Sequence, residues 1–239
     1  MNEKVEPNHI YQGNCYDLIK LVEDKSIDLI ITDPPYEIST TGAGIYKRAD
    51  KRYVKELVDI KDGFNETILN EMCRVLKKIN IYIWCSQKQI PNLIKYFVKE
   101  KGCNWNIICW HKTNPIPACG NKYLTDTEYC LFFREKGVKV YGSFETKKTY
   151  YLTPLNTKDK KKYNHPTIKP LDIIKNLVVN STEMGGVVLD TFLGSGTTAK
   201  ACQETGRRYI GFETNEEYYK TALERLNETT DIDDLIENL

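Results

Sequence analysis

The sequence contains no apolar run long enough to cross a membrane. A spanning helix needs about 20 consecutive apolar residues, and no such run occurs among the 239 residues. The first seven residues include two glutamates and a lysine, so they lack the apolar core of a signal peptide. We therefore expect a cytoplasmic protein without a membrane segment.

Closely spaced cysteines are also missing. The eight cysteines are scattered singly, with no Cys-x-x-Cys pair of the kind that binds zinc. A chain of this length can build its core without disulfides. We expect reduced, mostly buried thiols and no metal site.

The net charge of the whole chain is only +1, but two regions of the chain carry large charges of opposite sign. Between residues 136 and 162, eight lysines face only Glu145 and Asp159, which gives +6. From Glu213 to the end, nine acids face two basic residues, which gives −7. A polyanion would be attracted by the first region and repelled by the second.

Short β-rich runs alternate with segments of helical spacing. A hydrophobic content of 41% with 28% charged residues excludes a disordered or fibrous chain. The patterns predict strands at 9–12, 26–32, 79–85, 105–110, 129–133, 186–190 and 208–212, and helices near 18–22, 68–76, 90–98, 171–179, 197–203 and 218–226. This alternation predicts a doubly wound α/β fold with a mostly parallel sheet.

Two stretches depart from the alternation. Residues 135–164 are polar, rich in lysine and aromatic residues, and without helical period. We expect an insertion there, or a pair of short strands standing off the sheet. The glycines and small polar residues at 39–44 lead into a mixed-charge segment at 46–61, which suits either a mobile lid or a plain connection.

The first candidate site is the tetrapeptide Asp33, Pro34, Pro35 and Tyr36, which follows an apolar strand. Two prolines fix the backbone and remove two N–H donors, which leaves carbonyl groups free to accept hydrogen bonds. The turn offers a carboxylate, a carbonyl and an aromatic face, and this set fits a planar ring with an exocyclic amine. A rigid turn with a surface tyrosine is the alternative.

The second candidate site is a glycine-rich turn between a buried strand and a helix. It runs from Asp190 through Phe192, Gly194, Ser195 and Gly196 to Thr197. Glycines let the backbone approach a ligand, and the helix N-terminus offers free N–H groups to an anion. Glu213 ends the next predicted strand, where an acid would bind ribose hydroxyls. Both sites follow predicted parallel strands, so they face one crevice if those strands are neighbours.

These motifs together resemble the amino-group DNA methyltransferases that use S-adenosylmethionine. The catalytic motif precedes the cofactor motif, which is similar to the β subgroup of that family. Further segments resemble the family: Gly13 to Cys15, Arg74 to Leu76, Trp110 to Pro115, Glu128 to Leu131, and His165 to Pro170. The resemblance implies a Rossmann-like sheet of seven strands in circularly permuted order with a short inserted recognition region.

The resemblance also implies a division of the chain. Residues 1–134 would form the catalytic half, 135–164 the inserted target-recognition region, 165–230 the cofactor-binding half and 231–239 an acidic tail. Asp33 and the carbonyl of Pro34 would accept the two amine hydrogens, with Pro35 completing the turn and Tyr36 stacking on the base. The cofactor residues would be Asn14, Cys15, Lys169, Asp190, Phe192, Gly194, Ser195, Gly196, Thr197 and Glu213, with Asn14 at the cofactor's adenine and Lys169 near the cofactor carboxylate.

The implied activity is methylation of adenine N6 in double-stranded DNA, by base flipping and direct in-line transfer from S-adenosylmethionine, within a restriction-modification context. Cytosine N4 is the alternative target, and a nicotinamide-dependent oxidoreductase is the alternative class. Lys147, Lys148, Lys160, Lys161 and Lys162 are the candidate phosphate contacts, with Lys47, Arg48, Lys51 and Arg52 as the alternative set. Because the recognition region is short, a homodimer would be one way to extend it.

Overall fold

The computed structural model describes residues 4–36, 63–65, 67–117, 121, 123–165 and 167–228. The candidate lid at 39–61 and the acidic tail at 231–239 lie outside these residues, and so do Lys47, Arg48, Lys51 and Arg52.

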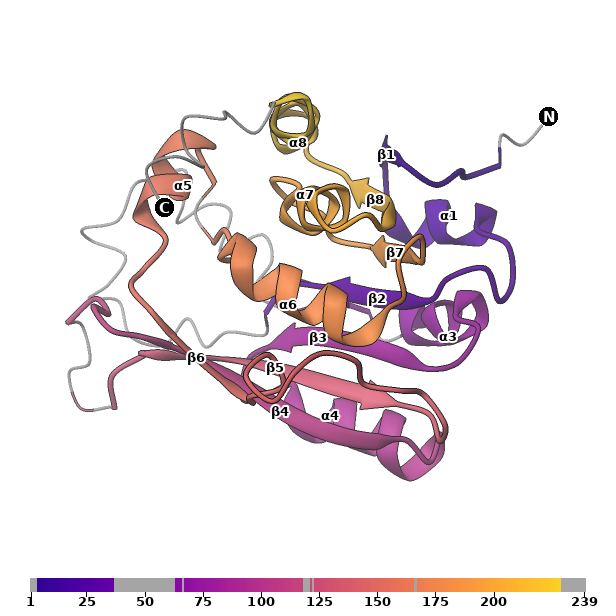
Figure 1. Cartoon of the computed structure of the whole chain (residues 1–239), viewed down its shortest axis with the longest axis horizontal. Coiled ribbons are helices and arrows are strands. Elements are labelled where there is room, and N and C mark those ends of the chain that lie inside the picture. The colour runs from indigo at the N-terminus through magenta and orange to yellow at the C-terminus, as the bar shows by residue number, and fades with distance from the viewer. Residues whose placement is uncertain are drawn as a thin grey trace.

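One sheet of eight strands runs through the described part of the chain (Figure 1), in the order β1-β8-β7-β2-β3-β5-β4-β6. The strands are β1 (His9–Gln12), β2 (Leu29–Thr32), β3 (Asn80–Cys85), β4 (Asn104–Lys112), β5 (Thr127–Arg134), β6 (Tyr150–Thr153), β7 (Val187–Asp190) and β8 (Arg208–Glu213). β1, β8, β7, β2 and β3 pair in parallel, and β5 lies antiparallel to both β3 and β4. The predicted α/β class with a mostly parallel sheet is confirmed.

Helices cover both faces of this sheet. They are α1 (Cys15–Leu18) with the short η1 (Ile19–Leu21), α3 (Thr67–Val75), α4 (Ile90–Ile94) with η2 (Lys95–Glu100), α5 (Thr157–Lys162), α6 (Leu171–Ser181), α7 (Thr197–Glu204) and α8 (Glu216–Asn227). One core cluster joins α3 and α4 to the sheet, through residues such as Met72 and Leu93. A second joins α6 and α7 to the opposite face, through residues such as Leu177 and Ala201. Central strands buried on both sides favour apolar residues at most positions, which explains the apolar runs in β2, β3 and β7.

The segment from 135 to 164 differs from the expectation of an insertion off the sheet. Its strand β6 pairs in parallel with the end of β4, so the sheet has eight strands instead of seven. The same segment contains the helix α5, which was not predicted. No residue of α5 is buried, so its sequence carries no apolar period.

No helix in the described part of the chain is long and apolar enough to cross a membrane. Nor do the described residues include three His, Cys, Asp or Glu side chains that gather where a metal ion could be held. The cytoplasmic location stays a prediction.

Candidate functional site

Two distant segments of the chain meet at the carboxyl edge of the sheet. β2 and β7 are parallel neighbours, with Ile30 opposite Leu189. Just beyond this register, the buried hydroxyl oxygens of Thr32 and Thr191 lie 3.0 Å apart. The expectation that the two motifs follow neighbouring strands and face one crevice is therefore confirmed.

A cavity of about 680 Å³ opens at this edge. Its walls include all four residues of the first motif, and most of the residues predicted to bind the cofactor: Asn14, Cys15, Lys169, Asp190, Phe192, Gly194, Ser195, Thr197 and Glu213. Gly196 is the exception. A Cβ atom there would lie 2.9 Å from the Cβ of Ala222, so this glycine allows the turn to pack against α8.

Asp33 places an unused acceptor in the cavity wall. Oδ1 of Asp33 is buried and accepts no hydrogen bond from any described residue. The carbonyl of Pro35 accepts a hydrogen bond of 3.0 Å from Nε2 of Gln89, which fixes the end of the turn. A donor from a bound molecule would satisfy the free oxygen of Asp33, because buried polar groups normally have partners.

Lys169 lies at the catalytic end of the cavity, against Asp33. Its ammonium group forms an ion pair with Oδ2 of Asp33, lies 3.1 Å from Oε2 of Glu128, and is 3.3 Å from the hydroxyl of Tyr36. Burial opposes the charge of this ammonium, but the neighbouring Asp33 and Glu128 hold the pKa of Lys169 above its usual value. Lys169 thus contacts two carboxylates of the protein itself, and its contact with a cofactor carboxylate stays a prediction.

The glycine-rich turn is tied to the end of β8. The amide of Gly194 donates to Oε2 of Glu213 at 2.7 Å, and the amide of Asn215 donates to Oε1 at 2.7 Å. Burial raises the pKa of Glu213, and these two amides act in the opposite direction. Gly194 has φ +55, and a Cβ there would lie 2.9 Å from Nε2 of His165. The turn therefore requires glycine both for its backbone and for the approach of His165.

Asp190 fixes the start of the same turn through a hydrogen bond to its backbone. Its Oδ1 accepts a hydrogen bond of 3.1 Å from the amide of Phe192. Burial raises the pKa of Asp190 to about 7, and the hydrogen bonds from Thr198 and Phe192 act in the opposite direction. Asp190 is only 4% exposed, so it acts on the turn and contributes little surface to the cavity.

Asn14 and Cys15 form the far wall, where the chain leaves β1. Oδ1 of Asn14 caps α1 by accepting a hydrogen bond of 2.9 Å from the amide of Tyr16. The oxygen expected to meet an adenine amine already has this donor. Burial raises the pKa of the Cys15 thiol to about 12, so the side chain is a neutral part of the wall.

Two charged residues at the site had no role predicted from the sequence. Glu128 lay in a family-like segment, but only the structure shows that its carboxylate contacts Lys169. Arg225 is 1% exposed in α8, where it donates to the hydroxyl of Thr197 at 2.8 Å and packs on the ring of Tyr163. A lone arginine in an acidic region was the only signal in the sequence, and it does not identify a partner.

The candidate DNA-binding lysines do not form one surface. Lys147 and Lys148 follow Thr146, whose carbonyl accepts from Asn180 near the end of α6, and Lys148 forms an ion pair with Glu145. The other three lysines belong to α5. Within α5, Lys160 is partly buried, Lys161 is exposed, and Lys162 lies 2.8 Å from Glu228. The five lysines therefore form two groups. In each group one lysine, Lys148 or Lys162, is paired with a glutamate.

Known proteins with similar sequences and structures are DNA methyltransferases. The chain is 31% identical to the type II methyltransferase M2.MboI of Moraxella bovis over 94% of this chain and 89% of that protein. It is 30% identical to M.HinfI of Haemophilus influenzae, over 92% of this chain and 68% of that protein. Among solved structures, the M1.HpyAVI–SAM complex is similar with a TM-score of 0.68 and 27% identity, covering 92% of this chain and 99% of that one. The cytosine-N4-specific PvuII DNA methyltransferase shares the fold, with a TM-score of 0.70 and 16% identity over 98% of this chain and 92% of that one.

A family model described as DNA methylase matches residues 27–224, which include β2 with the Asp33 turn and β7 with the glycine-rich turn. This match leaves the alternative of a nicotinamide-dependent oxidoreductase without support. The chain belongs to the DNA methylase family of N6 and N4 methyltransferases.

Proposed function

We propose that the protein transfers a methyl group from S-adenosylmethionine to adenine N6 in double-stranded DNA. The observation that carries this proposal is the buried Oδ1 of Asp33, which has no donor among the described residues. It lies in the wall of the cavity that also contains the glycine-rich turn. An amine that enters this cavity would supply the missing donor.

The residues of the cavity fit S-adenosylmethionine, which supplies a methyl group on a positively charged sulfur. Glu213 offers carboxylate lone pairs to ribose hydroxyls beyond the two amides that it already accepts. Ser195 and Thr197 lie at the N-terminus of α7, where free N–H groups favour the carboxylate of an amino-acid moiety. Gly194 leaves room for the ring of His165 beside this turn.

The Asp33 turn would prepare the target amine. An exocyclic amine in duplex DNA is paired and stacked, so the base must be flipped out of the helix. Asp33 and the carbonyl of Pro34 would accept its two hydrogens while the ring of Tyr36 stacks on the base. Asp33 does not remove a proton before transfer, because the neutral amine is far too weak an acid. The nitrogen becomes cationic on methylation and then releases a proton.

Adenine is favoured over cytosine by Asp33, the first residue of the Asp33–Tyr36 motif. Adenine-specific enzymes of the family tend to have aspartate at this position, whereas cytosine-specific enzymes tend to have serine. The test is incubation of unmethylated DNA with tritiated S-adenosylmethionine, followed by nucleoside analysis. We expect label in N6-methyladenine. Label in N4-methylcytosine would overturn the choice of base, and DNA without label would overturn the function.

Glu213→Gln is expected to weaken binding of S-adenosylmethionine at least tenfold, with a smaller effect on the rate at saturation. A hydrogen bond to a charged group contributes about 1.5 to 3 kcal/mol, and the new amide group would also face one of the two backbone N–H donors. Calorimetric titration measures the affinity, with the exposed Glu224→Gln as the control. An unchanged dissociation constant would remove Glu213 from the cofactor site.

Phosphate contacts are expected from the exposed side of α5. Each neutralised contact changes the slope of log affinity against log salt by about 0.9. Lys161→Ala should therefore weaken the salt dependence more than Lys162→Ala, because Lys162 is already paired with Glu228 at 2.8 Å. DNA binding measured against salt for both variants and for Lys147→Ala/Lys148→Ala decides between the two groups. If no slope changes, these lysines do not contact phosphates.

The homodimer stays a prediction, which analytical ultracentrifugation of the protein would test.

A further inference from the structure

A single ammonium group lies between two carboxylates at the catalytic end of the cavity. Lys169 contacts Oδ2 of Asp33 and lies 3.1 Å from Oε2 of Glu128. The three residues come from the turn after β2, from β5 and from the segment before α6. Lys169 is only 5% exposed, so water screens both contacts less than it would at the surface, and the position of the ammonium depends on both carboxylates.

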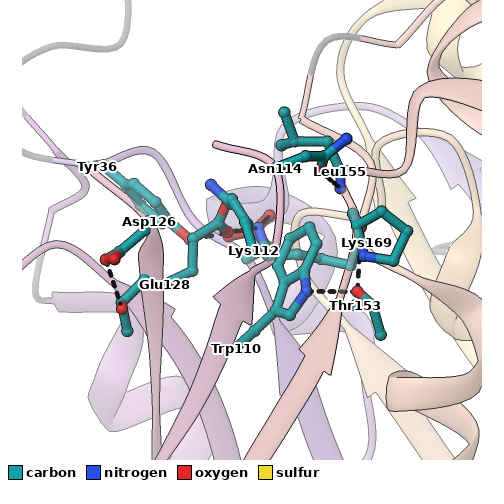
Figure 2. Close-up of polar contacts among 12 residues, drawn as sticks. Tyr36, Trp110, Lys112, Asn114, Asp126, Glu128, Thr153, Leu155 and Lys169 are labelled. Atoms are coloured by element: carbon teal, nitrogen blue, oxygen red, sulfur yellow. Dashed lines mark hydrogen bonds and ion pairs between the residues drawn. The ribbon is translucent and has the colours of Figure 1, made fainter. Parts of the chain in front are cut away.

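The second oxygen of Glu128 has a cation of its own. Lys112, at the end of β4, lies 2.6 Å from Oε1 of Glu128 (Figure 2). The end of β4 is in turn fixed to β6, because the indole N–H of Trp110 donates to the hydroxyl of Thr153 at 2.7 Å (Figure 2). Lys112 therefore fixes one oxygen of Glu128, and the other oxygen contacts Lys169.

This chain of charges ends at one oxygen without a partner. Oδ1 of Asp33 is buried and accepts nothing from the described residues, whereas Oδ2 and both oxygens of Glu128 face ammonium groups. A buried ion pair adds little stability compared with apolar packing, and a partly satisfied network costs stability. The arrangement is thus better suited to hold a ligand at Oδ1 than to stabilise the fold.

Building on the methyl transfer proposed above, we propose that Glu128 is a positioning residue, which shares Lys169 with Asp33 and so leaves Oδ1 of Asp33 free to accept a hydrogen bond from the target amine. Without Glu128, Lys169 would neutralise Asp33 alone and compete with the amine hydrogens. With it, Asp33 also remains a proton acceptor after methylation. In that step an N–H bond of the cationic amine breaks, an O–H bond forms at Oδ1, and the proton then passes to water.

The charges around Asp33 determine the direction of each expected change. Burial raises the pKa of Asp33, Lys169 acts in the opposite direction, and Glu128 raises this pKa further. Only ionised Asp33 accepts hydrogens, so the acid limb of the kcat profile follows its pKa. The other titratable groups that face this pair are Tyr36, Cys85, Lys112, Cys130, Lys160, His165 and Asp190. None of them is altered in the variants compared below.

Two variants are expected to move the pH profile in opposite directions. Glu128→Gln should shift the acid limb to lower pH, and Lys169→Gln should shift it to higher pH, each by about one unit or more, because a charge within ~4–6 Å moves a carboxyl pKa by ~1–3. Both should lower kcat by about 10- to 100-fold, since Asp33 is no longer held in place. The affinity for S-adenosylmethionine should stay close to the wild-type value in Glu128→Gln.

A matched control and a readout without turnover complete the test. Glu71→Gln removes a glutamate that is paired with Arg74 at 2.8 Å on α3, and it should leave the profile unchanged. Infrared titration of the apoprotein labelled with carbon-13 aspartate, with Asp33→Asn as reference, reports the pKa of Asp33 directly. It should fall in Glu128→Gln and rise in Lys169→Gln.

Equal profiles in wild type and Glu128→Gln, with DNA methylated by both, would overturn the positioning role alone. Wild-type protein that methylates no DNA would instead overturn the proposed function, and the infrared titration would still show whether Glu128 controls Asp33. If Glu128→Gln does not fold, Lys169→Gln decides: an acid limb or an infrared pKa that does not rise contradicts the proposal.

Discussion

Asp33→Ala is expected to lower methyl transfer at least about 10²-fold, the loss typical for removing a group that stabilises a transition state. The variant lacks the acceptor for the target amine and for the proton that this amine releases. Binding of S-adenosylmethionine should remain nearly intact, because the glycine-rich turn is held by Glu213 and Asp190 and not by Asp33. A methyl-transfer assay and calorimetric titration measure the two effects separately.

The fold should tolerate Asp33→Ala because Lys169 keeps a second carboxylate. Its ammonium would remain paired with Glu128 at 3.1 Å, so no isolated buried charge is created. Asp172→Ala is the matched control, since Asp172 lies at the start of α6 with its side chain 96% exposed. Retention of more than about a tenth of the activity in Asp33→Ala would contradict the role of Asp33, given the size of the loss expected from such contacts.

The central strands and the two motifs could be predicted from the sequence because burial leaves a clear pattern. Strands β2 and β7 are buried at every position and read as short apolar runs. The residues that follow each run, Asp33 and the glycine-rich turn, break the pattern with polar and flexible groups. Their meeting at one edge follows from parallel pairing.

β6 and α5 could not be assigned from the sequence because they bury too little. Strand β6 alternates between exposed and half-buried residues, and α5 buries none. A helix or strand that lies on the surface is stabilised by its contacts with neighbours, here the pairing of β6 with β4 and the bond from Lys162 to Glu228. Such contacts depend on the tertiary arrangement, which local periodicity does not record.

The partners of the charged residues were also beyond sequence reasoning. Lys169 was expected near a cofactor carboxylate, which stays a prediction, and its contacts with Asp33 and Glu128, which lie far from it in the chain, were not expected. Asn14 was expected to meet the adenine of the cofactor, which stays a prediction, and the capping of α1 by its oxygen was not expected. Where several donors or acceptors lie within reach of a side chain, the geometry of the folded structure determines which of them it contacts.

Gly194→Ala is expected to weaken binding of S-adenosylmethionine at least about tenfold, which corresponds to 1.4 kcal/mol. The residue has φ +55, where a side chain costs about 1 to 2 kcal/mol. The new methyl group would also lie 2.9 Å from Nε2 of His165, whose ring packs on Tyr218 with 4.4 Å between centroids. The turn must therefore shift, and the shift would disturb the bond of 2.7 Å from the Gly194 amide to Glu213.

Two further variants separate backbone strain from crowding in this prediction. Gly102→Ala introduces a side chain at φ +71 with nothing within 4 Å, so it should lower the free energy of unfolding by about 1 kcal/mol and leave cofactor affinity unchanged. His165→Ala combined with Gly194→Ala removes the crowding, and it should recover part of the affinity beyond the additive expectation. Thermal denaturation and calorimetric titration of five proteins, the wild type, the three single variants including His165→Ala, and the double variant, measure both quantities. If Gly194→Ala lost only as much stability as Gly102→Ala and bound S-adenosylmethionine normally, the close approach of His165 to the turn would have no part in cofactor binding.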